Sequence, residues 1–391
     1  MKKCPLFAVI VLQVGFSAIA FAQGPLTPPG PPGPTMRTLD QIEPRTPINS
    51  LPFSINQPGS YYLTTNLTGA SGQSGITVAA HRVTIDLNGF ELAGVAGAVS
   101  GIQVLGMRTN LVVRNGWVHG WPVSGINASN ANASHFERVQ SLHNGAGILA
   151  GGSSILESCA AGFNAGVGIR ARQGSLVRNC SAFSNGAFGI GLGSGVIEGC
   201  AARANRGNGI QAGEQTQITA CSASTNAGNG IVLTNDGVIR NCVAARNALN
   251  GIVGEDTVII THCTASLNGS NGIVAIIGCG ISDCIANLNS LDGISLGSRC
   301  RIVGNNATDN GEYEFVGAGF FVSGDDNFLE GNNSVHNFDG YLILGEFNFV
   351  VKNKASFSFN VGFETGPNNR VGPVLGTPTV TNANAWANFA Y

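Results

Sequence analysis

The chain has 391 residues, a net charge of −2 and a pI near 6.3. Charged residues make up 11% of it, against about 25% in an average domain, and its 56 glycines are about twice the usual share. This composition supplies no basic face, so no nucleic-acid partner is expected, and the glycine content favours a fold with frequent tight turns.

The first 36 residues contain two segments that do not belong to the folded part. Lys2 and Lys3 precede an apolar run that ends in the small-x-small sequence AFA at residues 20–22. This pattern predicts a secretory signal peptide over residues 1–22, and no later stretch approaches the ~20 apolar residues of a membrane span. Residues 23–36 are rich in proline and glycine and predict a stiff polyproline linker. We therefore expect an exported protein, secreted, surface-bound or periplasmic.

A Gly-Ile or Gly-aromatic pair recurs along the rest of the chain about every 21 residues. The pairs begin at Gly75, Gly101, Gly125, Gly147, Gly168, Gly189, Gly209, Gly230, Gly251, Gly272, Gly293, Gly319, Gly340 and Gly362. A sustained period of this length predicts a solenoid, and the apolar alternation after each pair indicates short strands with one buried face. We therefore predict an all-β fold, a single β-helix of about 14 coils over residues 75–365. We expect an N-terminal cap over 37–74, with a short helix near 39–42, and a C-terminal cap or tail over 366–391.

Cysteines form a column with the same period. They are Cys159, Cys180, Cys200, Cys221, Cys242, Cys263 and Cys284, and each has an alanine two residues later. Residues two apart in a strand point the same way, so both columns are predicted to be small interior fillers. Without the signal peptide nine cysteines remain, and stacked Cβ atoms about 4.8 Å apart are too distant for a disulfide, which needs about 3.8 Å. We expect a buried ladder of free thiols, with a few strained disulfides as the alternative.

Asparagines close each coil in the motif N-x-x-N-G-I. It begins at Asn205, Asn226, Asn247 and Asn268. Asparagine tolerates left-handed backbone, and stacked amides can bond to the coils above and below. These asparagines are therefore predicted to form a structural ladder.

The N-x-x-N-G-I turns, together with P-G-S-Y-Y-L at 58–63 and V-T-I-D-L-N-G at 83–89, resemble the right-handed parallel β-helix proteins of the pectin-lyase-like superfamily, bacterial exported type. The resemblance covers about residues 50–365 and implies right-handed winding. It leaves two function classes open. One is a non-catalytic protein that binds extracellular or cell-surface polysaccharide or serves as a surface scaffold. The other is a polysaccharide lyase, hydrolase or epimerase, but the N-x-D, G-H-G, R-I-K and D-P-H signatures of such enzymes are missing, which favours the first class.

The C-terminal coils carry the acidic candidates for a site. Asp325 and Asp326 resemble one fragment of the hydrolase site and could be catalytic or bind a cation. Other coils carry acids at the same place, namely Glu214, Asp236, Glu255 and Asp256, which favours a solvated turn edge instead. Glu312 and Glu314 belong to the stretch 309–346, which has eight acids and no lysine or arginine. Such a field could hold calcium or bind a cationic group, although an ordinary loop insertion on an acidic surface is the favoured interpretation, and no other cofactor is expected.

The early coils carry the aromatic and histidine candidates. Trp121 could stack on a sugar ring, with His119 and His143 beside it. The two histidines align in the repeat and could instead take a metal, or all three could be surface residues at a cap junction. Trp117 aligns with the alanine column and is expected in the core. The oligomeric state stays open.

Overall fold

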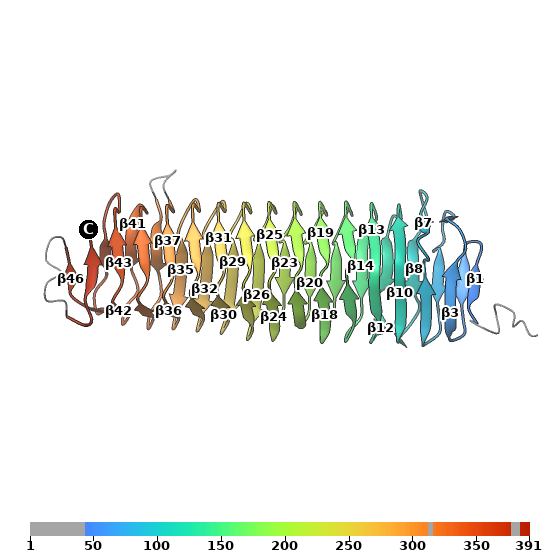
Figure 1. The fold of residues 1–391 in the computed structure, drawn as a ribbon, viewed down its shortest axis with the longest axis horizontal. Helices are drawn as coiled ribbons and strands as arrows, with labels where there is room; N and C mark the ends of the chain where they lie inside the picture. Colours follow the sequence, from blue (N-terminus) through green and yellow to red (C-terminus); the bar gives the residue numbers. More distant parts are fainter. Residues whose placement is uncertain (1–43, 312–315, 377–383) are drawn as a thin grey trace, which may run out of the picture. The chain divides into compact units, whose positions relative to one another are not determined.

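The computed structural model describes residues 44–311, 316–376 and 384–391, and these residues contain strands and turns but no helix. The described strands pair in parallel, three to a coil, and each coil hydrogen-bonds to the coils before and after it (Figure 1). The predicted all-β solenoid is confirmed. The signal peptide, the Pro/Gly linker and the short helix near 39–42 all fall outside the described residues. Within the described part, no helix is present that could serve as a membrane span.

The first strand of each coil belongs to a sheet of fifteen strands. These strands are β2 (Phe53–Ile55), β5 (Ile76–Val78), β8 (Ser100–Val104), β11 (Ser124–Ala128), β14 (Ala146–Ala150), β17 (Ile169–Ala171), β20 (Ile190–Leu192), β23 (Ile210–Ala212), β26 (Ile231–Asn235), β29 (Ile252–Asp256), β32 (Ile273–Ile277), β35 (Ile294–Ser298), β38 (Ala318–Val322), β41 (Asp339–Ile343) and β44 (Phe363–Thr365). Fourteen of them carry the predicted pairs. Strand β2 pairs with β5, so stacking begins one coil earlier, inside the segment expected to be a cap. We call the outer side of this sheet the first-strand face.

The second and third strands of the coils extend the stack in the same way. In the coil that starts with β17 they are β18 (Ser175–Arg178) and β19 (Ser181–Phe183), which pair with their counterparts one coil on. The last coil is closed by β47 (Asn388–Ala390), which pairs with β43 (Lys354–Ser356). We call the outer side of the third strands the third-strand face.

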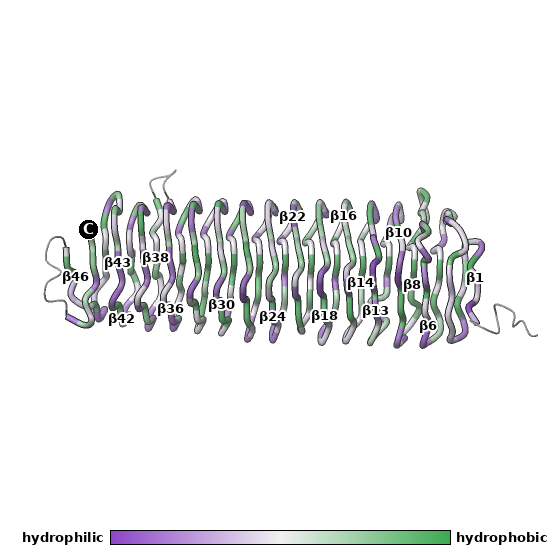
Figure 2. The backbone as a smooth tube through the Cα atoms, in the orientation of Figure 1, coloured by the Kyte–Doolittle hydropathy of each residue, from purple (hydrophilic) through white to green (hydrophobic). Residues whose placement is uncertain are grey.

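Buried and more exposed residues alternate along many of the strands, as in β24 (Thr216–Thr219). Apolar and polar segments are correspondingly interspersed along the coils (Figure 2). Inward positions are occupied coil after coil by the same residue type. The isoleucines of the first strands are fully buried, among them Ile169, Ile190, Ile210, Ile231, Ile252, Ile273 and Ile294. Because each branched side chain packs against its own copy, one continuous apolar core follows the stack and supplies most of the stabilisation, at about 25 cal/mol per Å² buried.

The residue before each buried turn asparagine has left-handed backbone. Ala204 has φ 55°, Thr225 φ 57° and Arg246 φ 55°, and each directly precedes an asparagine of the motif. The expectation that the asparagines themselves take this conformation is wrong for Asn205 and Asn226, which have negative φ. Their side chains turn inward instead, so their amides rather than their backbones define the turn.

The inward amides form a hydrogen-bonded ladder. Asn226 Nδ2 donates to Asn247 Oδ1 at 2.9 Å and to the carbonyl of Ala202 at 3.1 Å. Asn226 Oδ1 accepts from the backbone N–H and the Nδ2 of Asn205, at 3.0 and 2.9 Å. The ladder contains Asn164, Asn185, Asn205, Asn226, Asn247, Asn268, Asn289, Asn310 and Asn337. A buried amide can be satisfied in this way because it carries both donors and acceptors.

Removal of one ladder amide should weaken the stack. Asn226→Ala removes the acceptor of the backbone N–H and of one Nδ2 hydrogen of Asn205, at about 1–3 kcal/mol for each unsatisfied group. The Ala202 carbonyl also loses a donor, whereas Asn247 Oδ1 keeps the backbone N–H of residue 226. We expect a loss of about 2–4 kcal/mol, measured as a shift in the urea unfolding midpoint. The control is Asn229→Ala, an outer asparagine that is half-buried and that water can replace; it should cost less than half as much. Equal losses of stability in the two variants would show that the inner ladder contributes no more to stability than the outer asparagines.

The cysteine column is also buried. All nine cysteines of the described residues are buried and unpaired. The backbone N–H of Cys180 points to the Sγ of Cys200 at 3.5 Å, and that of Cys200 points to the Sγ of Cys221 at 3.5 Å. The neighbouring thiols, together with burial, raise the pKa of the Cys180 thiol well above its ordinary value. Beyond Cys284 the column continues as asparagine, since Asn305 Oδ1 accepts from the Cys284 N–H at 2.9 Å.

The thiols should be protected in the native protein. Protein lacking residues 1–22 should release about nine thiols to Ellman's reagent when denatured without reductant, and almost none when native, because the reagent cannot reach thiols that are buried. A single free thiol after denaturation would mean that the column is paired by disulfides.

An outer amide column ends in a carboxylic acid. Asn208, Asn229, Asn250 and Asn271 each accept, through Oδ1, the backbone N–H at the same position one coil on, and the last of these donors is the N–H of Asp292 at 2.9 Å. Asp292 Oδ1 accepts the Ala318 N–H at 2.8 Å. Burial raises the pKa of the Asp292 carboxyl from 3.8 to about 6, and the bond from Ala318 only partly opposes this. The folded protein therefore binds this proton more tightly than the unfolded chain.

The raised pKa predicts a pH-dependent loss of stability. Between about pH 4 and pH 6 the folded state holds more protons than the unfolded state, so the contribution of Asp292 falls as pH rises through this window. Asp292→Asn should therefore stabilise the protein by about 2 kcal/mol at pH 7 and by much less at pH 4. Unfolding midpoints at both pH values measure the difference, with the exposed Asp283→Asn as the control. A gain of the same size at both pH values would assign it to amide stacking instead of charge.

Candidate functional site

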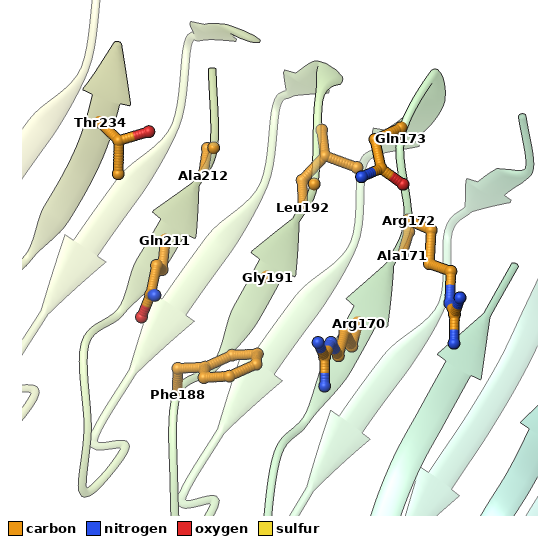
Figure 3. A pocket seen from close by; sticks show the side chains of 12 residues that line it. Arg170, Ala171, Arg172, Gln173, Phe188, Gly191, Leu192, Gln211, Ala212 and Thr234 are labelled. Carbon is orange, nitrogen blue, oxygen red and sulfur yellow. The ribbon is translucent and has the colours of Figure 1, made fainter. Parts of the chain in front are cut away.

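A groove of about 550 Å³ crosses the first-strand face over β17, β20 and β23. Its polar lining comes from Arg170, Arg172, Gln173, Gln211 and Thr234. The ring of Phe188 lies between the side chains of Arg170 and Gln211 in the view of Figure 3. The groove therefore combines an aromatic surface with two cationic and two amide side chains.

The groove exists because outward positions in adjacent coils differ in size. Arg170, Gly191 and Gln211 occupy the same register in successive strands. Gly191 has no side chain, and a Cβ there would lie 2.4 Å from the Phe188 ring. The missing side chain lets Phe188 lie against the strand, so the ring forms part of the groove lining between the longer neighbours.

The charge of the surrounding coils is positive, in contrast to the acidic C-terminal stretch. Residues 165–250 contain seven arginines, no lysine and three acids. Arg170 and Arg172 are exposed, and the lining residues include no carboxylate and no imidazole. A groove lined with one sign of charge raises the local concentration of the opposite charge, so this one favours an anionic ligand.

The two tryptophans of the early coils lie in the opposite environments to those predicted: Trp121 is in the core and Trp117 is at the surface. Trp121 is fully buried, so it cannot stack on a sugar, and that prediction is wrong. Its Nε1 donates to the Leu92 carbonyl at 2.9 Å, and its backbone N–H donates to Asn144 Oδ1 at 3.0 Å. Trp121 thus stands at the end of the amide ladder and fills the core beside Gly69, where a Cβ would lie 2.4 Å from its ring. Trp117, expected in the core, is 38% exposed.

A one-residue slip in register explains this exchange. Val118, and not Trp117, lies in register with Ser141 and through it with the alanine column at Ala161. The early coils are longer than 21 residues, so counting from the glycine pairs places Trp117 one position off. In a strand such a slip moves a side chain to the opposite face.

The two histidines do not form a pair. His119 lies in register with Leu142, and its Nε2 is 3.5 Å from Glu91 Oε2. His143 follows one residue later, and its ring stacks on Phe163 with centroids 5.0 Å apart. The predicted alignment of the two imidazoles is therefore wrong.

The acidic candidates lie in a turn. Asp325 Oδ1 accepts the Glu346 N–H at 2.8 Å, and the Asp325 N–H donates to Ser298 Oγ at 3.0 Å. Asp326 is exposed and has left-handed backbone with φ 59°. These contacts give the pair a structural role in coil-to-coil turns, and neither residue lines the groove.

The described residues contain no cluster of potential metal ligands. No group of three His, Cys, Asp or Glu side chains there is placed to hold a metal ion. Glu312 and Glu314 lie outside the described residues, so calcium binding by the stretch 309–346 stays a prediction.

Sequence reasoning missed the groove. Its residues are outward ones that follow the Gly-Ile pairs, and they differ from coil to coil. The signal that could have found them is the interruption of the apolar outward column Val232, Val253 and Val274 by Arg170, Gly191 and Gln211.

Comparisons with known proteins agree with this architecture. The family model described as "Right handed beta helix region" matches residues 118–254 and 192–310. No curated protein matches the sequence significantly. The A-module of mannuronan C-5 epimerase AlgE6 from Azotobacter vinelandii superimposes with a TM-score of 0.51 at 16% identity, over 81% of this chain and 90% of that one.

Two further solved structures are similar at lower scores. The AlgE4 A-module of the same organism gives a TM-score of 0.47 at 16% identity, over 81% of this chain and 91% of that one. The catalytic domain of a GH87 alpha-1,3-glucanase gives 0.48 at 16% identity, over 71% and 62%. With the repeat, the parallel stacking and the family match, the chain is a right-handed parallel β-helix repeat protein.

Proposed function

We propose that this protein is exported and binds an acidic polysaccharide along its first-strand face without cleaving it. The observation that carries the proposal is the groove lined by Arg170, Arg172 and Phe188, in which Arg170 lies nearer to the Phe188 ring and Arg172 farther along the lining (Figure 3). A guanidinium presents a planar fork of donors that matches a carboxylate or sulfate group. An aromatic ring supplies the apolar surface on which the C–H face of a sugar can lie.

The form of the groove suits a polymer. It is open, and its lining comes from four successive coils, β17 to β26, so a chain can lie across the strands and leave at either end. Gln173, Gln211 and Thr234 add uncharged hydrogen-bonding groups along this path, and sugar hydroxyls can both donate to and accept from them.

The lining also supports binding rather than cleavage. Acid–base catalysis needs a proton donor and acceptor with pKa values near the working pH, whereas a guanidinium stays protonated. The groove lining offers arginines and amides but no such pair. The alternative is a polysaccharide lyase, hydrolase or epimerase; the neighbour with the TM-score of 0.51 is named as a mannuronan epimerase.

Loss of the groove arginines should abolish retention on acidic glycans. Arg170→Ala/Arg172→Ala should bind polygalacturonate and alginate at least tenfold more weakly in affinity electrophoresis, and binding by the unmodified protein should weaken with salt. The matched control is Arg203→Ala/Arg206→Ala, which removes two exposed arginines of neighbouring coils outside the groove. Equal losses of affinity in both double variants would show that binding depends only on the overall positive charge, and would contradict a specific site in the groove.

Incubation of the protein with the same polysaccharides tests for catalysis. Reducing ends and unsaturated products are assayed with and without calcium, and neither is expected. Products that disappear in Asp325→Ala/Asp326→Ala would instead make the protein an enzyme with its site in the C-terminal coils.

A further inference from the structure

A second pocket lies on the third-strand face, around Trp117. This residue belongs to β10 (Leu111–His119), and 38% of its surface is exposed. The pocket has a volume of about 230 Å³ and is lined by Gly89, Asn115, Gly116, Trp117, Arg138 and Gln140. Trp117 is the one aromatic residue of this lining, and its indole offers a flat apolar face to a ligand that enters the hollow.

Polar residues flank the ring on both sides along the stack. Trp117 lies in register with Glu91 in the preceding coil and with Gln140 in the following one. A Cβ at Gly89 would meet nothing within 4 Å, so the space beside the ring is open. The indole therefore presents an apolar surface bordered by an amide and a carboxylate.

The rim is held in place by a hydrogen-bond network. Arg138 Nε donates to Asn115 Oδ1 at 2.9 Å, and Asn115 Nδ2 donates to Asp86 Oδ1 at 3.2 Å. Asp86 also accepts from Arg114 Nε at 3.0 Å, and Arg138 forms an ion pair with Glu137. Arg138 is paired with Glu137 and Arg114 with Asp86, so this side of the rim is preorganised and close to neutral. On the other side of the ring, Glu91 Oε2 lies 3.5 Å from His119 Nε2.

We propose that the Trp117 pocket binds one ring of a neutral, flat glycan chain whose sugar units have equatorial hydroxyls. Such a ring exposes C–H groups on its faces and hydroxyls at its edge, which matches an indole face bordered by Gln140, Asn115 and Arg138. The pocket is smaller than the ~300–1,000 Å³ of sites that enclose a drug-sized ligand, so it holds a single unit of a chain that continues past it. The paired charges leave no field to select an anion, in contrast to the groove.

This site is independent of the groove. It lies on another face and several coils nearer the N-terminus, in β10 and β13 (His135–Leu142) rather than β17 to β23. A protein with both sites can hold two different chains at once.

The test uses cellohexaose as the probe for a flat neutral chain and maltohexaose as the curved one, by isothermal titration. Cellohexaose should bind and maltohexaose should bind at least tenfold more weakly. Trp117→Ala should weaken cellohexaose binding at least tenfold, and Trp117→Tyr, which keeps an aromatic face, should retain most of it. Gln140→Ala tests the rim and should weaken binding severalfold.

Two controls separate this site from other causes. Trp386→Ala removes a tryptophan that is 52% exposed in the last coil and should leave cellohexaose binding unchanged. Arg170→Ala/Arg172→Ala should also leave it unchanged, so failure of the groove and failure of this pocket are distinguishable. No binding of cellohexaose at millimolar concentration, or full binding by a folded Trp117→Ala variant, would overturn the proposal.

Discussion

Hydrogen bonding between parallel backbones sets the distance from one coil to the next, and every other feature of the structure follows from this spacing. At about 4.8 Å a side chain has its counterpart in the next coil as its nearest neighbour. An interior position is therefore restricted to residues that can lie against copies of themselves. Isoleucine meets this condition by packing, cysteine by its small size, and asparagine because its amide donates on one side and accepts on the other. A carboxylate can only accept: Asp292, at the end of an amide column, accepts the Ala318 N–H, and its burial raises the pKa of its carboxyl group.

The same condition explains which parts of the fold could be predicted from the sequence. Stacking places one residue type at a constant interval, so the glycine pairs and the Cys, Ala and Asn columns locate the strands and their inward faces. The prediction fails where the interval changes. Gly101, Gly125 and Gly147 are 24 and 22 residues apart instead of 21, and the inward face was assigned one residue off in this region. Because of this one-residue error, Trp117 was predicted in the core although it is exposed, and Trp121 was predicted at the surface although it is buried.

The binding surfaces could not be predicted in this way, for a related reason. A site on a solenoid arises where outward residues differ between coils, and the repeat carries no information about such differences. Arg170, Gly191 and Gln211 share one register, and the groove results from their unequal sizes together with Phe188. The contacts of Phe188 depend on the missing side chain of the following strand, which only the folded structure brings to the same place. The Trp117 pocket likewise requires Gly89 and Arg138, which come from coils on either side.

The geometry of a stack also separates folding from recognition. Core columns couple each coil to its neighbours, so a change there is felt along the stack, whereas an outward residue contacts few groups that hold the fold. Arg170 and Arg172 can therefore be exchanged at little cost to stability, and the same holds for Trp117 because it is exposed. A linear polymer lying along the stack meets one outward residue of each column per coil. The ligand class of a face is thus set by the few residues exposed on it. Two faces of one β-helix can therefore prefer different ligands, one an anionic chain and one a neutral chain, without any change in the core that supports both.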